Sequence, residues 1–142
     1  STSFSNGAAY ADLDNDGDLD LVVNNIDEKA TILKNNTNKN YVQFQFKGNL
    51  KNPFGIGASI KLETETGSQL IENYPTRGYQ SSVEPLLHFG LGGQKVVKKI
   101  TITWADGKVE QAKNIPINKR LVLFYCLCFN VWCPLCSIPR RV

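Results

Sequence analysis

Five aspartates alternate along nine residues near the N-terminus: Asp12, Asp14, Asp16, Asp18 and Asp20. So much like charge in one short segment is costly unless a cation neutralises it, and hard oxygen ligands at every second position suit Ca²⁺. The spacing D-x-D-x-D-G-x-x-D predicts that the first three carboxylates face the ion and that Asp18 contributes its backbone carbonyl. Asp20 would close the shell as a bidentate ligand. An acidic, solvated turn is the alternative, since Asp-Gly and Asn-Asp are ordinary turn residues. Five aspartates in register favour calcium.

The segment that follows the aspartates differs from an EF-hand. That loop needs a bidentate glutamate at its twelfth position, where this chain has Val23. Residues 19–23 are apolar and rich in β-branched side chains, which is typical of a strand rather than of an exiting helix. We therefore expect the calcium loop to connect two strands, at residues 7–11 and 20–24.

The rest of the chain alternates apolar and polar residues with a period of two, which is typical of strands with one buried face. Asp106-Gly107 predicts a tight hairpin turn. No stretch has a helical period, so the pattern predicts a small all-β sandwich or barrel-like domain. The apolar positions are Val42, Phe44 and Phe46; Ala58, Ile60 and Leu62; Ile100, Ile102 and Trp104; Leu121, Leu123 and Tyr125.

These motifs follow one another in an order that resembles a known family. Residues 6–23 and 30–36 look like one FG-GAP/VCBS-type β-propeller repeat. The motifs at residues 52–58, 77–81, 88–92 and 104–107 are similar to those of the ASPIC/UnbV domain, which follows such repeats in the cartilage acidic protein-like family. One departure is Ala105, where the family tends to have proline. The resemblance implies a partial propeller blade with a calcium loop, followed by a small β domain.

Three segments are expected along the chain. Residues 1–36 form the repeat remnant, polar residues 35–40 form a junction, and residues 41–125 form the ASPIC/UnbV-like domain. Because a propeller blade does not bury its faces alone, we expect a C-terminal fragment of a longer propeller protein.

Residues 126–142 differ in composition from the rest of the chain. All four cysteines lie here, at positions 126, 128, 133 and 136. A foreign tail, a membrane segment over residues 121–139, and a metal or disulfide cluster remain alternatives. Membrane contact is expected only if this tail is native.

Catalytic and nucleic-acid functions have little support. The single histidine, His88, could be combined with Ser81 or Ser82 and Asp106, but no nucleophile elbow surrounds either serine. Glu63 and Glu65 alternate with Lys61, which suits a solvated edge better than an acid/base pair. Lysines and arginines are scattered, without the clustering that nucleic-acid binding needs. We expect neither an enzyme nor a nucleic-acid partner.

The sequence therefore predicts a non-catalytic, calcium-binding interaction or adhesion module that is secreted or exposed at the cell surface or envelope. Its partner would be an extracellular protein or a glycan. One alternative is a carbohydrate-binding module that uses Tyr74, Tyr79 or Trp104. Another is an accessory domain of an enzyme whose catalytic part lies elsewhere. Arg77, Tyr79 and Gln80 could form a ligand surface, although packing on the neighbouring blade explains them better.

Overall fold

The computed structural model describes residues 4–125, and this part of the chain is all β, with twelve strands in four sheets and no helix. No described sheet closes on itself, so the structure contains no barrel. No helix of the described residues is long and apolar enough to span a membrane. The cysteine-rich segment 126–142 and its three alternatives lie outside the described residues.

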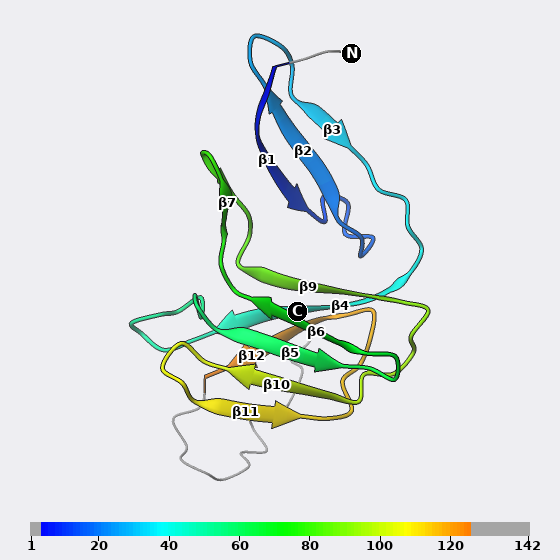
Figure 1. The fold of residues 1–142 in the computed structure, drawn as a ribbon, viewed down its shortest axis with the longest axis vertical. Coiled ribbons are helices and arrows are strands. Elements are labelled where there is room, and N and C mark those ends of the chain that lie inside the picture. The colour runs from blue at the N-terminus through cyan, green and yellow to red at the C-terminus, as the bar shows by residue number, and fades with distance from the viewer. Residues whose placement is uncertain (1–3, 126–142) are drawn as a thin grey trace.

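The N-terminal sheet is an antiparallel meander of β1 (Ser5–Ala11), β2 (Asp20–Asn25) and β3 (Thr31–Leu33). Ala11 pairs with Asp20, so the intervening residues leave and rejoin the sheet at neighbouring positions. We call residues 12–20 the acidic loop. In Figure 1 this connection lies at the end of the N-terminal sheet that faces the rest of the molecule.

Two further sheets form what we call the sandwich. The first has the order β11-β10-β5-β6 and is antiparallel, and the second has the order β12-β4-β9. In the second sheet, β4 pairs antiparallel with β9 and parallel with β12. The strands are β4 (Asn40–Lys47), β5 (Ser59–Glu63), β6 (Ser68–Glu72), β9 (Leu86–Gly92), β10 (Lys99–Thr103), β11 (Val109–Ala112) and β12 (Arg120–Phe124).

A fourth, two-stranded sheet projects from the sandwich toward the N-terminal sheet (Figure 1). It is the hairpin of β7 (Thr76–Gly78) and β8 (Ser81–Ser82). Elements β1 and β7–β8 contact each other, so this hairpin connects the two parts of the molecule.

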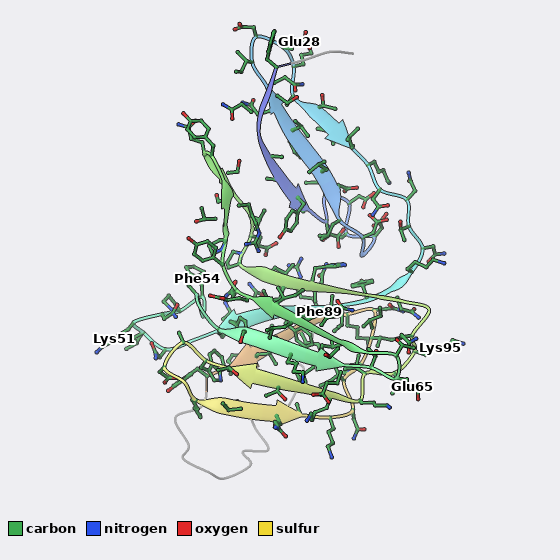
Figure 2. All side chains as sticks on the ribbon, viewed as in Figure 1. Glu28, Lys51, Phe54, Glu65, Phe89 and Lys95 are labelled. Carbon is green, nitrogen blue, oxygen red and sulfur yellow. The ribbon has the colours of Figure 1, made fainter. Side chains whose placement is uncertain are left out.

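The core of the sandwich confirms the alternation of the sequence. Phe44 and Phe89 lie edge to face with ring centroids 5.7 Å apart, and Phe46 packs against Trp104 at 5.1 Å; Figure 2 places Phe89 within the sandwich. Burial of one large apolar side chain contributes about 1.5–3 kcal/mol to folding. The buried apolar residues are Val42, Phe44, Phe46, Ala58, Ile60, Leu62, Leu87, Phe89, Leu91, Val97, Ile100, Ile102, Trp104 and Leu121.

The turn predicted at Asp106-Gly107 is also present. It joins β10 to β11, with Trp104 N donating to Lys108 O at 2.8 Å and Gly107 N donating to Trp104 O at 2.9 Å. Gly107 has φ of 85°, a left-handed conformation that glycine adopts without strain.

Candidate metal centre

The base of the acidic loop is fixed by the buried side chain of Asp20, which is 3% exposed. Its Oδ1 accepts a hydrogen bond from Asn35 N at 2.8 Å, and its Oδ2 accepts one from Leu13 N at 3.2 Å. The sequence predicted Asp20 as a bidentate ligand. In the structure both of its oxygens bind backbone amides, so this side chain joins the loop to the segment that follows β3.

Three carboxylates converge within the loop. Asp12, Asp14 and Asp16 each place one oxygen so that all three lie within 4.8 Å of one another. Asp12 Oδ2 accepts from Gly17 N at 3.2 Å, whereas Asp12 Oδ1 is buried without a hydrogen-bond partner among the described residues. A carboxylate oxygen of this kind is costly to bury unless a cation or a donor compensates it.

The Asp18 side chain is buried as well, with 9% of its surface exposed. Its Oδ2 accepts from Thr37 N at 2.6 Å, while its Oδ1 has no hydrogen-bond partner within residues 4–125. Burial raises the pKa of this carboxyl group, and the charges of Asp16, Asp20 and Asp14 raise it further. The sequence indicated only a carbonyl role for this residue, because spacing alone does not reveal its burial.

Lys34 supplies the positive charge nearest to the loop. Its ammonium forms an ion pair with Asp14 Oδ2. This contact lowers the pKa of Asp14 and raises the pKa of Lys34. Both side chains of this pair are exposed, and no other aspartate of the acidic loop forms an ion pair within residues 4–125.

The acidic loop lies on the outer face of the β12-β4-β9 sheet. Gly17 has φ of 96°, and a Cβ at this position would lie 1.9 Å from the Tyr41 ring. Gln43 of β4 is only 3% exposed, and its Nε2 donates to Asp12 Oδ2 at 3.2 Å. Sequence reasoning missed Gln43, because alternation places it on the polar face of β4 and gives no sign of what covers that face.

His88 of β9 lies beside this contact. Its ring is stacked on Tyr41 with centroids 5.7 Å apart and an interplanar angle of 8°, and its Nδ1 is 3.4 Å from Gln43 Nε2. Burial lowers the pKa of His88, against the opposing effect of the Asp12 and Asp18 charges. A hollow of about 250 Å³ opens here between the loop and the sheet, lined by Gly17, Asp18, Leu19, Asn35, Thr37, Lys39, Asn40, Tyr41, His88 and Gly90.

The β7–β8 hairpin makes the second contact with the N-terminal sheet. Arg77 Nε donates to Tyr10 OH at 2.8 Å, and the guanidinium lies 5.8 Å from the centroid of the Tyr10 ring. Ser81 Oγ accepts from Ala8 N at 3.2 Å. Packing between the two parts of the chain therefore accounts for Arg77, whereas Tyr79 remains 67% exposed.

The residues considered for catalysis have separate partners. Ser81 Oγ donates to Tyr79 O at 2.8 Å, His88 faces Gln43 and Tyr41, and Asp106 Oδ2 accepts from Tyr125 OH at 2.6 Å. Glu63 lies near Lys61 and Lys99, at 3.4 and 3.7 Å. Among residues 4–125, no hydrogen bond joins Ser81, His88 and Asp106 into a catalytic triad.

Comparison with known proteins finds a family match for the part of the chain that forms most of the sandwich. Residues 48–125 match the family model described as ASPIC and UnbV. Cartilage acidic protein 1 from Xenopus tropicalis is 32% identical over 116 residues, and the proteins of that name from Homo sapiens and Mus musculus are 30% and 29% identical over 109 residues. Each alignment covers 72% of this chain but only 16–17% of the relative, so the chain corresponds to about one sixth of those proteins. The chain belongs to the ASPIC and UnbV family.

Proposed function

We propose that this chain is a non-catalytic, calcium-binding module of an extracellular or cell-surface protein, in which Ca²⁺ holds the acidic loop in one conformation. The observation that carries the proposal is the group of three convergent carboxylates, together with the buried Asp12 Oδ1, which has no hydrogen-bond partner among residues 4–125. Oxygen-only donors of this kind suit a hard divalent cation. Asp12, Asp14 and Asp16 would hold the ion, and the Asp18 carbonyl would complete part of its shell.

The ion would have a structural role. Extracellular calcium modules have dissociation constants of about 10⁻⁴–10⁻³ M, so the site would stay occupied where calcium is abundant. An ion that binds only the folded chain stabilises it by RT ln(1 + [L]/Kd). The name of the relatives, which refers to cartilage and to acidic character, supports an extracellular setting.

The N-terminal sheet has features of a blade from an FG-GAP-type propeller. It is a three-stranded meander with exposed apolar side chains, including Ile32 at 64% and Leu33 at 53%. One repeat does not bury its faces alone, and the relatives are much longer than this chain. We infer that preceding repeats of the full protein cover this sheet, and that the sandwich and the β7–β8 hairpin face an extracellular protein or glycan.

A carbohydrate-binding role is the second candidate. Tyr74 and Tyr79, which flank β7, are 55% and 67% exposed and could stack on sugar rings, whereas Trp104 is 4% exposed and packs in the core. Binding to a glycan array that persists in EDTA and is lost in the variant Tyr79→Ala would support this role. No bound glycan in the presence of calcium would contradict it.

Calorimetric titration of the full chain with Ca²⁺, together with thermal unfolding in calcium and in EDTA, tests the calcium proposal. We expect one binding site and a higher unfolding midpoint in calcium. The variant Asp16→Ala should lose both effects, because it removes one of the three convergent carboxylates. Glu28→Ala is the matched control: it removes the same charge at the end of the N-terminal sheet away from the acidic loop (Figure 2) and should bind calcium like the parent. Absence of heat and of a calcium-dependent midpoint in the parent would overturn the proposal.

A further inference from the structure

We propose that Gln43 of β4 is a positioning residue of the cation site, so that binding of the ion and seating of the acidic loop on the sandwich are thermodynamically linked. This inference rests on the proposed calcium function and extends it across the junction between two sheets. It concerns a residue 31 positions away from the aspartate that it contacts.

Gln43 lies where a polar side chain would ordinarily be exposed to solvent. Its neighbours Val42 and Phe44 are buried in the core, yet Gln43 itself is 3% exposed. The reason is that the acidic loop covers it, with Asp12 in hydrogen-bonding contact. A buried amide needs partners at both ends, and this one has them.

The orientation of the Gln43 amide follows from those partners. Arg120 Nε, 3.2 Å away, is a donor only, so it faces Oε1 of the amide. The NH₂ group is thereby directed at Asp12 Oδ2, which accepts a hydrogen bond from it. Arg120 in turn lies 3.6 Å from Glu84, so the amide is held from the sandwich side.

This arrangement divides the two oxygens of Asp12 between two tasks. Oδ2 accepts from Gly17 N and Gln43 Nε2, whereas Oδ1 has no partner among the described residues. Donors on one oxygen fix the rotation of the carboxylate and leave the other for a cation. Partners of metal ligands that act in this way typically change metal affinity by about ten- to hundred-fold when they are mutated.

Tyr41 adds a steric contact at the turn of the loop. Its ring lies so close to Gly17 that a Cβ there would overlap it, and His88 stacks on the ring. The turn that brings Asp16 toward Asp12 and Asp14 is thus shaped against β4. Because coupling between two equilibria is reciprocal, a loop seated on β4 should bind the ion more tightly, and bound ion should strengthen the seat.

The test uses calorimetry to compare the calcium affinities of variants of the whole 142-residue chain. Gln43→Ala should bind Ca²⁺ about ten- to hundred-fold more weakly than the parent. Gln45→Ala is the matched control, because Gln45 lies two residues along the same face of β4 and no hydrogen bond of its side chain to the loop is present among residues 4–125. The control should bind like the parent.

A second variant and a second readout separate positioning from loss of folding. Gln43→Met keeps the length and flexibility of the side chain but removes the donor, so it should retain the circular dichroism of the parent and still lose calcium affinity. Terbium emission excited through tyrosine reports the ion beside the Tyr41 ring and should require correspondingly more Tb³⁺ in this variant.

The outcomes distinguish the two proposals. Weaker binding in both Gln43 variants, with the control unchanged, supports the positioning role. Parent-like affinity in a folded Gln43→Met variant overturns the role and leaves the calcium function intact. A parent chain that binds neither Ca²⁺ nor Tb³⁺ overturns both.

Discussion

The N-terminal sheet and the sandwich use different sources of stability. In the sandwich, Phe44, Phe89 and Ile60 have no exposed surface. In the N-terminal sheet, all three residues of β3 are exposed, and the buried positions include the polar or charged side chains of Asp18, Asp20 and Asn25. The sandwich is stabilised by the burial of apolar side chains, which requires no bound ion. The N-terminal sheet depends on hydrogen-bonded carboxylates, on docking contacts and, in our proposal, on an ion.

This contrast explains why the candidate metal ligands lie in the acidic loop and the rigid support lies in the sandwich. An unpaired charge is costly to bury in an apolar core, so the charged ligand oxygens lie in the loop outside it. The core nevertheless provides a rigid sheet, and β4 of that sheet is what the acidic loop contacts through Tyr41 and Gln43. The acidic loop thereby has a fixed surface against which it packs.

The largest expected effect comes from the core. Phe44→Ala should lower the free energy of unfolding by about 3–5 kcal/mol, because it leaves a cavity beside Phe89. Ile32→Ala, in exposed β3, should change it by less than about 0.5 kcal/mol. Denaturant unfolding followed by circular dichroism measures both. Equal losses in the two variants would show that the N-terminal sheet shares the core-type stabilisation that we assign to the sandwich alone.

The next effect concerns the charge buried in the acidic loop. Asp18→Asn should raise the unfolding midpoint in EDTA, because it removes a carboxylate whose raised pKa reports an unfavourable charge. Addition of calcium should raise the unfolding midpoint of this variant by less than that of the parent, since the attraction of the Asp18 charge for the ion is lost. Thermal unfolding in EDTA and in calcium gives both midpoints. A lower midpoint in EDTA would mean that the hydrogen bond from Thr37 N outweighs the repulsion.

Much of the sandwich could be predicted from the sequence, because alternation is a local property. Val42, Phe44 and Phe46 were expected on one buried face of a strand, and the structure places them in the core. Likewise, the turn at Asp106-Gly107 depends on residues that are adjacent in the chain. The barrel alternative is not what the structure shows, because no described sheet closes on itself. Closure of a barrel depends on whether edge strands pair with each other, and no local sequence pattern encodes such pairing.

The candidate metal centre was predictable only in part. The aspartates and their spacing were visible, and three of the five converge in the structure. The binding of Asp20 to two backbone amides, the burial of Asp18 and the cover over Gln43 all depend on residues brought from elsewhere in the fold. The parallel pairing of β12 with β4, which brings Arg120 to Gln43, is likewise a long-range contact. No periodicity in the sequence reports such contacts.

A smaller effect is expected at the second contact between the two regions. Tyr10→Phe removes the acceptor of Arg77 Nε and should cost about 0.5–1 kcal/mol, the usual net value of a hydrogen bond at a partly solvated site. A double-mutant cycle with Arg77→Ala, measured by thermal unfolding, isolates the coupling. Strict additivity of the two substitutions would show that the hairpin does not hold the N-terminal sheet through this pair.

The smallest effect lies at the turn between β10 and β11 and tests whether the sandwich is independent of the acidic loop. Tyr125 OH donates to Asp106 Oδ2 at 2.6 Å, and this bond is the main reason that the pKa of Asp106 lies below its ordinary value. Tyr125→Phe should therefore raise the pKa of Asp106, while the edge-to-face packing on Trp104 persists with the remaining ring.

The sign of the resulting pH dependence follows from linkage. A carboxyl group with a lowered folded pKa stabilises the fold above its unfolded pKa, and this stabilisation is lost as the pH falls through the folded pKa. Acid unfolding of the parent should thus extend to slightly lower pH than that of Tyr125→Phe, with or without calcium, because the acidic loop has no part in this bond. An NMR titration of Asp106 in both proteins measures the shift. If the pKa of Asp106 moved with calcium rather than with the Tyr125 hydroxyl, the sandwich would be coupled to the loop well beyond β4, and the division between the two regions would have to be redrawn.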